Sequence, residues 1–122
     1  MELLHKDLTA KILEACFEVS NELGAGFLES VYGKALLVAL RQKGIKAEGQ
    51  IPLAVIFRDE VVGEFVADIL VENKVILELK AAKVLAPEHQ AQLINYLKAT
   101  GIEIGLLVNF GKRKLEYRRL HR

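Results

Sequence analysis

The sequence has few residues that could form covalent or metal cross-links. Its 122 residues include one cysteine, Cys16, and three scattered histidines. One cysteine cannot form a disulfide within the chain, and this set cannot supply the closely spaced ligands of a zinc site. Cys16 lies in an apolar helical pattern, which favours a packed core thiol over a nucleophile. This cysteine usage suits a reducing compartment, so we expect a cytoplasmic protein.

The chain also lacks long hydrophobic runs and a strong charge of either sign. No run approaches the roughly 18 apolar residues of a membrane span, and the N-terminus lacks the pattern of a signal peptide. We therefore expect no membrane association. The formal net charge is +1, which argues neither for nor against a nucleic-acid partner. The GxxxxGK[ST] phosphate loop and the GxSxG nucleophile elbow are both missing from the sequence.

The apolar content is sufficient for a folded core. Hydrophobic residues make up 52% of the 122 residues, and a chain of this length buries about two-thirds of its unfolded surface. We expect one domain over 1–122, because the sequence contains no internal repeat, low-complexity segment or linker.

Hydrophobic periodicity and turn residues predict three helices and a largely antiparallel sheet. The helices are predicted at 8–24, 28–43 and 87–101, and the strands at 47–60 (ending in a turn), 61–71, 74–82, 102–111 and 115–118. Short connections make the first three strands a meander, whereas the third helix crosses over to a parallel or mixed pairing. The predicted fold class is α/β, or α+β with a mixed sheet.

Three charged residues stand inside apolar strands. Asp68 has apolar neighbours on both sides, and Glu78 and Lys80 share one face because residues two apart in a strand point the same way. The register decides whether the carboxylates meet. A two-residue turn at 72–73 would put Asp68 and Glu78 on opposite faces, whereas a three-residue loop or a bulge would put them opposite each other. If they act together, the hairpin must have the longer loop or the bulge.

Two carboxylates placed side by side repel each other, and a divalent cation resolves that conflict. Mg²⁺ is often held by one or two carboxylates together with waters and phosphate oxygens. Asp68 and Glu78 are therefore candidate ligands for Mg²⁺ (or Mn²⁺), with the Leu79 carbonyl as a further ligand. Lys80 would orient or help deprotonate an attacking water, or stabilise charge on a phosphate.

These residues resemble the D…(D/E)xK signature of the PD-(D/E)XK nuclease superfamily. The stretch GFLESVY, Gly26 to Tyr32, is similar to the GxxExxY motif that names a small family in that superfamily, and 89–111 is similar to that family's later segment. The resemblance covers nearly the whole chain and implies a restriction-endonuclease-like αβββαβ core with an extra N-terminal helix. One departure is Ala67, which stands where the signature has proline.

The resemblance also implies roles for individual residues. Asp68 and Glu78 match the metal-binding acids, and Lys80 matches the catalytic lysine. Glu29 matches an acidic residue that an early helix supplies, acting directly or through water. The implied function is a Mg²⁺-dependent endonuclease or exonuclease that hydrolyses phosphodiester bonds in nucleic acid, with DNA the expected substrate.

The helix at 87–101 and the basic C-terminal tail supply the remaining candidates. Gln92 matches a helical glutamine that assists catalysis in some branches of the superfamily. Gln90 lies nearby, and Tyr96 lies one turn after Gln92 on the same side. The tail residues that would contact phosphates in a salt-dependent way are Lys112, Arg113 and Lys114. A chain this small has no room for a separate recognition domain, so target choice would come from homodimerisation, a partner, or structure in the nucleic acid.

Each assignment has a structural alternative. Asp68 can cap a turn or pair with Lys80, Glu29 can simply favour a helix N-terminus, and Gln92 and Tyr96 can be ordinary helix-surface residues. The basic tail can be a solvated face. Two other functions therefore stay open: a catalytically inactive module that binds nucleic acid or protein, and a homodimeric interaction protein. In the latter, Asp68 and Lys80 would form an ion pair with no open pocket beside them.

Overall fold

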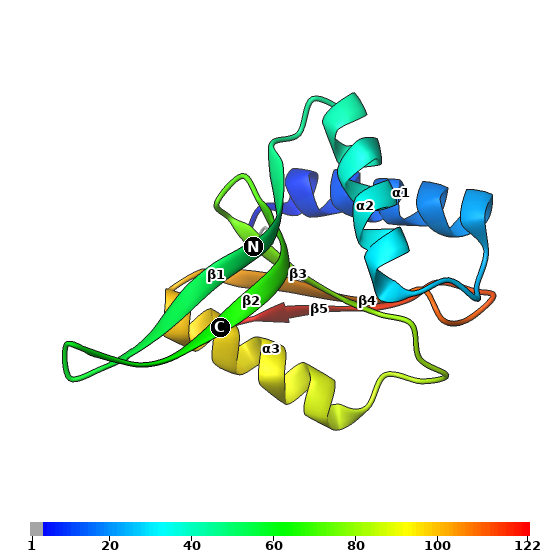
Figure 1. Ribbon diagram of the computed structural model, residues 1–122. Helices are drawn as coiled ribbons and strands as arrows, with labels where there is room; N and C mark the ends of the chain where they lie inside the picture. Colours follow the sequence, from blue (N-terminus) through cyan, green and yellow to red (C-terminus); the bar gives the residue numbers. More distant parts are fainter. Residues whose placement is uncertain (1–3) are drawn as a thin grey trace.

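The computed structural model describes residues 4–122, which form a five-stranded mixed sheet with helices on both faces (Figure 1). The elements are α1 (Lys6–Leu23), α2 (Glu29–Gln42), β1 (Ala47–Phe57), β2 (Glu60–Val71), β3 (Val75–Lys80), α3 (Pro87–Thr100), β4 (Ile104–Asn109) and β5 (Glu116–His121). The strands lie in the order β1-β2-β3-β4-β5. This confirms the predicted fold class and agrees with a restriction-endonuclease-like core preceded by one extra helix.

The pairing follows the predicted topology. Strands β1, β2 and β3 form an antiparallel meander, β3 and β4 are parallel, and β5 returns antiparallel to β4. Helix α3 makes the crossover between the parallel strands. Strand β5 extends to His121, beyond the predicted end, because its ladder with β4 continues to the pair Ile104–His121. Among the described residues, no helix is both long and apolar enough to cross a bilayer.

Apolar side chains fill the space on each side of the sheet. Helices α1 and α2 cover one face, and α3 covers the other (Figure 1). Strands β3 and β4 are buried on both faces, as their nearly continuous apolar runs predict. Cys16 is a fully buried free thiol in the larger core, and burial raises its pKa to about 12. The thiol is therefore a packing group, as expected.

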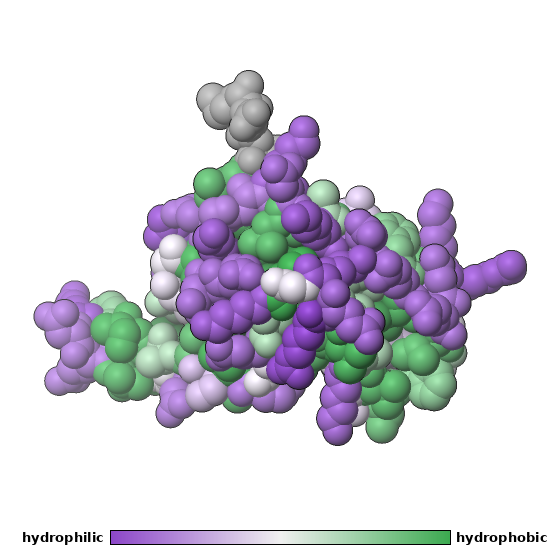
Figure 2. Space-filling view, turned by 90° about the horizontal axis from the view of Figure 1, so that it is seen from above, coloured by the Kyte–Doolittle hydropathy of each residue, from purple (hydrophilic) through white to green (hydrophobic). Residues whose placement is uncertain are grey.

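The outer half of the β1–β2 hairpin projects beyond the rest of the sheet as an arm. Figure 2 shows it on the left, with an apolar patch behind a polar tip. The exposed apolar side chains on this arm are Ile56, Phe57, Val61, Val62 and Val66. The inner half of the same hairpin is the part that positions the candidate site.

The side chains of strand β2 change from one face of the sheet to the other at Asp68. After this residue, Ile69 and Val71 pack in the core beneath α1 and α2. Before it, Ala67 packs in the core beneath α3. Regular alternation would keep these three odd-numbered residues on one face. The strand therefore turns over between Ala67 and Ile69, and Asp68 lies at the crossing.

The backbone of strand β1 explains the turnover. Gln50 lies across from Asp68, and the pairs that bracket it are Gly49–Ile69 and Ile51–Ala67. Gln50 has a φ of 54°, in the left-handed region that residues other than glycine enter at a cost. Such a residue interrupts the pleat and increases the local twist. The sheet thus has local backbone strain directly opposite Asp68.

Substitutions at Gln50 test this strain. Gln50→Val should lower the free energy of unfolding by about 1–2 kcal/mol, because a β-branched side chain tolerates the left-handed region poorly. Gln50→Gly should leave stability within about 1 kcal/mol of the wild type, because glycine adopts this conformation freely. Urea unfolding followed by circular dichroism measures both. An equal loss of unfolding free energy in the two variants would show that the left-handed φ of Gln50 does not reduce stability.

Candidate active site where strands β2 and β3 diverge

The β2–β3 hairpin has the longer loop that cooperation between the carboxylates requires. The last pair before the loop is Val71–Val75, which leaves 72–74 as the connection. This register brings Asp68 and Glu78 to neighbouring positions, one step beyond the last ladder pair. The three-residue loop is confirmed, and the two-residue alternative is wrong.

The two strands diverge at the carboxylates. Their ladder ends at the pair Ile69–Leu77, although β2 and β3 both continue past it. Beyond this point Asp68 takes the place of a strand partner: its Oδ2 accepts the backbone N–H of Leu79 at 2.7 Å. A short bond from an amide to a carboxylate is among the stronger hydrogen bonds in proteins. It fixes the Asp68 carboxylate in the opening between the strands.

Glu78 is the buried acid of the pair. Its residue is 8% exposed, and its Oε1 atom is buried without a hydrogen-bond partner. Burial, and next the Asp68 carboxylate, raise the pKa of Glu78 to about 8, while the charge of Lys80 acts in the opposite direction. Unpaired buried carboxylate oxygens are costly. The arrangement is therefore one that a bound cation would relieve.

Lys80 lies two residues after Glu78 on the same strand. It is partly buried at the end of β3, and none of the ion pairs within residues 4–122 includes Lys80, Asp68 or Glu78. The interaction-protein alternative required an Asp68–Lys80 ion pair with no pocket nearby. The structure has no such pair, and a cavity opens beside Asp68, so that alternative loses its structural basis.

Helix α3 brings Tyr96 toward the carboxylates. The Tyr96 ring stacks on Phe65 of β2 with centroids 3.7 Å apart and planes 8° from parallel. Burial first, and then the charges of Glu78 and Asp68, raise the pKa of Tyr96. Gln92 is exposed one turn earlier on the helix.

The two glutamines stand apart from the acids. Gln90 is partly buried, and in the part of the chain that the structure describes neither Gln90 nor Gln92 hydrogen-bonds to Asp68 or Glu78. Their positions on α3 leave them free to contact a substrate.

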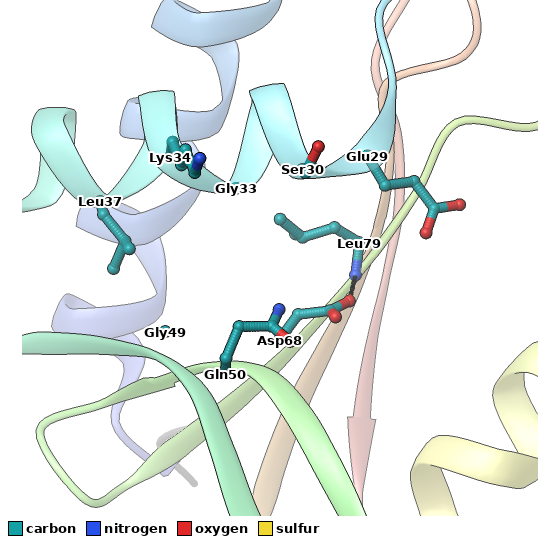
Figure 3. Close-up of a pocket in the computed structure, with 9 residues that line it drawn as sticks. All are labelled: Glu29, Ser30, Gly33, Lys34, Leu37, Gly49, Gln50, Asp68 and Leu79. Carbon is teal, nitrogen blue, oxygen red and sulfur yellow. Dashed lines mark hydrogen bonds between the residues drawn. The ribbon is translucent and has the colours of Figure 1, made fainter.

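Glu29 reaches the site from the other side of the sheet. It is the first residue of α2, and its Oε2 accepts the backbone N–H of Ala81 at 3.3 Å, next to Lys80. Figure 3 shows Glu29 and Asp68 among the residues that line one cavity, with the Leu79 amide bonded to Asp68. The structure thus connects the helix α2 acid to the end of β3.

Tyr32, the last residue of the GFLESVY stretch, fastens the turn that leads to Glu29. It is fully buried, its hydroxyl donates to the Gly24 carbonyl at 2.6 Å, and the same oxygen accepts the Phe27 N–H at 3.2 Å. Its ring stacks on Phe110 with centroids 4.7 Å apart. No role for Tyr32 was predicted from the sequence. The available signal was its three-residue spacing from Glu29, which places both on neighbouring parts of one helix face.

Asn109 is a second positioning residue that the sequence analysis missed. It is fully buried at the end of β4. Its side chain accepts the N–H of Ala82 at 2.9 Å and donates to the Ala82 carbonyl at 2.8 Å. These bonds fix the chain just after Lys80 and end β3 two residues before its predicted limit. The signal was a lone amide at the end of an otherwise apolar strand.

The basic tail begins at the same edge of the sheet as Lys80. Lys80 pairs with Asn109 across the parallel strands, and the turn that carries the predicted phosphate contacts follows directly. Lys112 is 3.7 Å from the Glu116 carboxylate, whereas Arg113 and Lys114 are exposed. This placement is compatible with a nucleic acid running from the carboxylates along this edge.

The carboxylate pair fits a hard divalent cation. Asp68 and the unpaired Glu78 Oε1 supply oxygen ligands, as Mg²⁺ prefers. Within residues 4–122, no three His, Cys, Asp or Glu side chains gather into a metal cage. An ion here would therefore complete its coordination with water, backbone or substrate oxygens, which is common for Mg²⁺.

Removing the Tyr32 hydroxyl tests its anchoring role. Tyr32→Phe should lower the free energy of unfolding by about 1–2 kcal/mol, because the Gly24 carbonyl and the Phe27 amide lose a buried partner. Tyr117→Phe is the matched control, since Tyr117 is 38% exposed. Urea unfolding measures both variants, and equal stability of Tyr32→Phe and the wild type would contradict the role.

Glu78 should make the metal-free protein less stable as pH rises. Its pKa in the folded state is about 8, above its ordinary 4.5, so the folded protein retains a proton that the unfolded chain releases. The stabilising contribution is complete below pH about 4.5 and is lost as pH rises through about 8. The unfolding temperature, measured in EDTA, should fall over this range.

Two variants test whether Glu78 causes this pH dependence of stability. The ionisable groups acting on Glu78 are Asp68 and Lys80, and its charge in turn acts on Tyr96. Glu78→Gln should flatten the slope of unfolding temperature against pH, because it cannot release a proton. Glu64→Gln, at an exposed position of β2, should keep it. An unchanged slope in Glu78→Gln would assign the effect to another group.

Comparisons with known proteins agree with this architecture. No curated protein sequence is similar enough to be matched to the chain. Among solved structures, the crystal structure of SSO0001 has a TM-score of 0.61 and 17% sequence identity, over 97% of this chain and 60% of that chain. At this identity the likeness shows the fold alone. The sequence profile of the PD-(D/E)XK nuclease superfamily matches residues 6–120. The chain therefore belongs to the PD-(D/E)XK nuclease superfamily.

Proposed function

We propose that this protein is a divalent-metal-dependent nuclease that hydrolyses phosphodiester bonds, with DNA as the first substrate to test. The observation that carries the proposal is the Asp68 carboxylate bonded to the Leu79 amide, between Glu78 and Lys80, where the strands diverge. Lys80 belongs to none of the ion pairs found among residues 4–122. We also propose that the chain is one domain of the GxxExxY type. The hydrogen bonds of Tyr32 that hold the GFLESVY turn, and the bond that the Ala81 N–H donates to Glu29, support this.

The chain's residues would divide the work by position. Asp68 and Glu78 would hold Mg²⁺ or Mn²⁺, which supplies charge neutralisation at the phosphate and lowers the pKa of water when bound. Lys80 would position the attacking water and stabilise the negative charge that develops on the phosphate. Glu29 would act beside Asp68 from the shared cavity.

Residues on α3 and in the tail would hold the substrate. Gln92, Gln90 and Tyr96 lie on the helix beside the carboxylates, and Gln92 would support the reacting phosphate. The tail residues Lys112, Arg113 and Lys114 would contact the backbone, so affinity should fall with salt. Selection of a target would come from homodimerisation, a partner, or the shape of the nucleic acid.

Metal binding and cleavage together test the proposal. Calorimetry should show that Mg²⁺ and Mn²⁺ bind the wild type and do not bind folded Asp68→Ala, which loses one carboxylate ligand. Lys80→Ala should still bind metal, because Lys80 is not a proposed metal ligand. It should cleave at least about a hundredfold more slowly, because it loses the cation that positions water and stabilises charge on the phosphate. Lys98→Ala, at an exposed position on α3, is the matched control.

The outcomes separate the two functions. Cleavage at the wild-type rate by Asp68→Ala and Lys80→Ala would overturn the proposed site. Nucleic-acid binding without metal-dependent cleavage by the wild type would identify the inactive binding module instead. Single-stranded, duplex and branched DNA and RNA should all be assayed, because the proposal does not depend on one form.

A further inference from the structure

A cavity of about 330 Å³ lies between helix α2 and the inner half of the β1–β2 hairpin, beside Asp68 (Figure 3). Helix α2 forms one wall, and Gln50 and Asp68 lie on the opposite side, with Leu79 between them. This volume is at the lower end of the range for small-ligand pockets, roughly 300–1,000 Å³. A space of this size holds one small group of a ligand.

Gly33 is the first sign that the space is needed. It lies in the interior of α2, where glycine destabilises a helix relative to alanine. A Cβ atom at this position would lie 3.6 Å from the Leu79 side chain, which is an ordinary contact. Packing therefore does not require glycine here. Gly33 lines the cavity, so the missing methyl group leaves the cavity slightly larger than alanine would.

Lys34 is the second sign. It is exposed, it lines the same cavity, and it belongs to none of the ion pairs found among residues 4–122. A cation thus borders a cavity whose other charged members are the carboxylates of Glu29 and Asp68. Lysine in this position suits a phosphate, which carries a charge opposite to its own.

Gln50 adds a group that can recognise a base. Its side chain offers an amide donor and acceptor, and it lies across from Asp68 on a strained backbone. Strained residues persist where the surrounding structure holds them, and they are concentrated at binding sites. Leu79 and Leu37 supply apolar surface on the floor and wall of the cavity, as expected for a pocket that takes a flat ring.

We propose that this cavity holds one unpaired nucleotide next to the phosphodiester that is cut. The base or sugar lies in the space bordered by Gly33, Leu37 and Leu79, and Lys34 contacts a phosphate of the same strand. This inference rests on the proposed nuclease function and deepens it. It defines the substrate as nucleic acid that is single-stranded at the point of cleavage.

Binding in EDTA tests the cavity without cleavage. Fluorescence anisotropy with a labelled single strand and the matching duplex should show tighter binding of the single strand. Gly33→Ala should raise the unfolding temperature, because alanine favours the helix, yet weaken single-strand binding about tenfold by filling the cavity. If Gly33→Ala is more stable but binds the single strand less tightly, the weaker binding results from the smaller cavity and not from unfolding.

Lys34→Gln tests the phosphate contact. It should weaken single-strand binding several-fold and reduce the slope of log affinity against log salt by about 0.7, the value for one phosphate contact on a single strand. Lys11→Gln, at an exposed position on α1, is the matched control and should change neither. Wild-type binding by Gly33→Ala, or equal affinity for duplex and single strand, would overturn the inference.

Cleavage assays with Mg²⁺ keep this inference distinct from the proposed function. If the wild type cuts only continuous duplex, the nuclease function stands and the single-strand cavity is wrong. If the wild type binds single strands through Gly33 and Lys34 but cuts nothing, the cavity is supported as a nucleotide site and the nuclease function fails.

Discussion

The hydrogen bond from the Leu79 amide to the Asp68 carboxylate is the contact on which the candidate site depends. It forms where β2 and β3 leave each other, and it satisfies a backbone group that a regular ladder would have paired. Because a side chain takes over from the strand, the sheet can open there without leaving a buried amide unpaired. The opening holds the Asp68 carboxylate close enough to Glu78 to raise its pKa, and it leaves Asp68 lining the cavity beside α2. The arrangement of the two carboxylates and the opening toward the cavity both depend on this hydrogen bond.

Two residues outside the proposed catalytic set fix the backbone on either side of the site. Tyr32 fixes the turn before Glu29, and Asn109 fixes the chain after Lys80. Both are fully buried amid apolar neighbours, and both bond to backbone groups, which leaves few alternative conformations. Glu78 is the opposite case, because its carboxylate has a buried oxygen without a partner and a raised pKa. A fold that tolerates this has enough apolar core on both faces of the sheet to offset it, and groups with such pKa values are concentrated at functional sites.

Much of the fold was predictable because it depends on local pattern. Helical periodicity gave α1 and α2, Pro87 gave the start of α3, and continuous apolar runs gave β3 and β4. Strand ends were less predictable: β5 runs three residues further than its local pattern indicated, because pairing with β4 sustains it. For the site, the residue types indicated Asp68, Glu78 and Lys80. The sequence did not decide between a two-residue and a three-residue loop, and the relative position of these side chains depends on that length. A shift of one residue moves every side chain of a strand to the opposite face of the sheet.

Local sequence pattern was enough to predict the set of elements, the antiparallel meander with its crossover, and the charged residues within otherwise apolar strands. Only the tertiary structure decided that the hairpin loop has three residues, that β2 turns over opposite Gln50, and that Tyr32 and Asn109 hold the two flanks of the site. The difference arises because some determinants of structure are local in the chain and others are not. Periodicity and turn chemistry act over a few residues, whereas the φ of Gln50 and the partners of Tyr32 and Asn109 are set by contacts between elements far apart in the chain, which local sequence pattern does not specify.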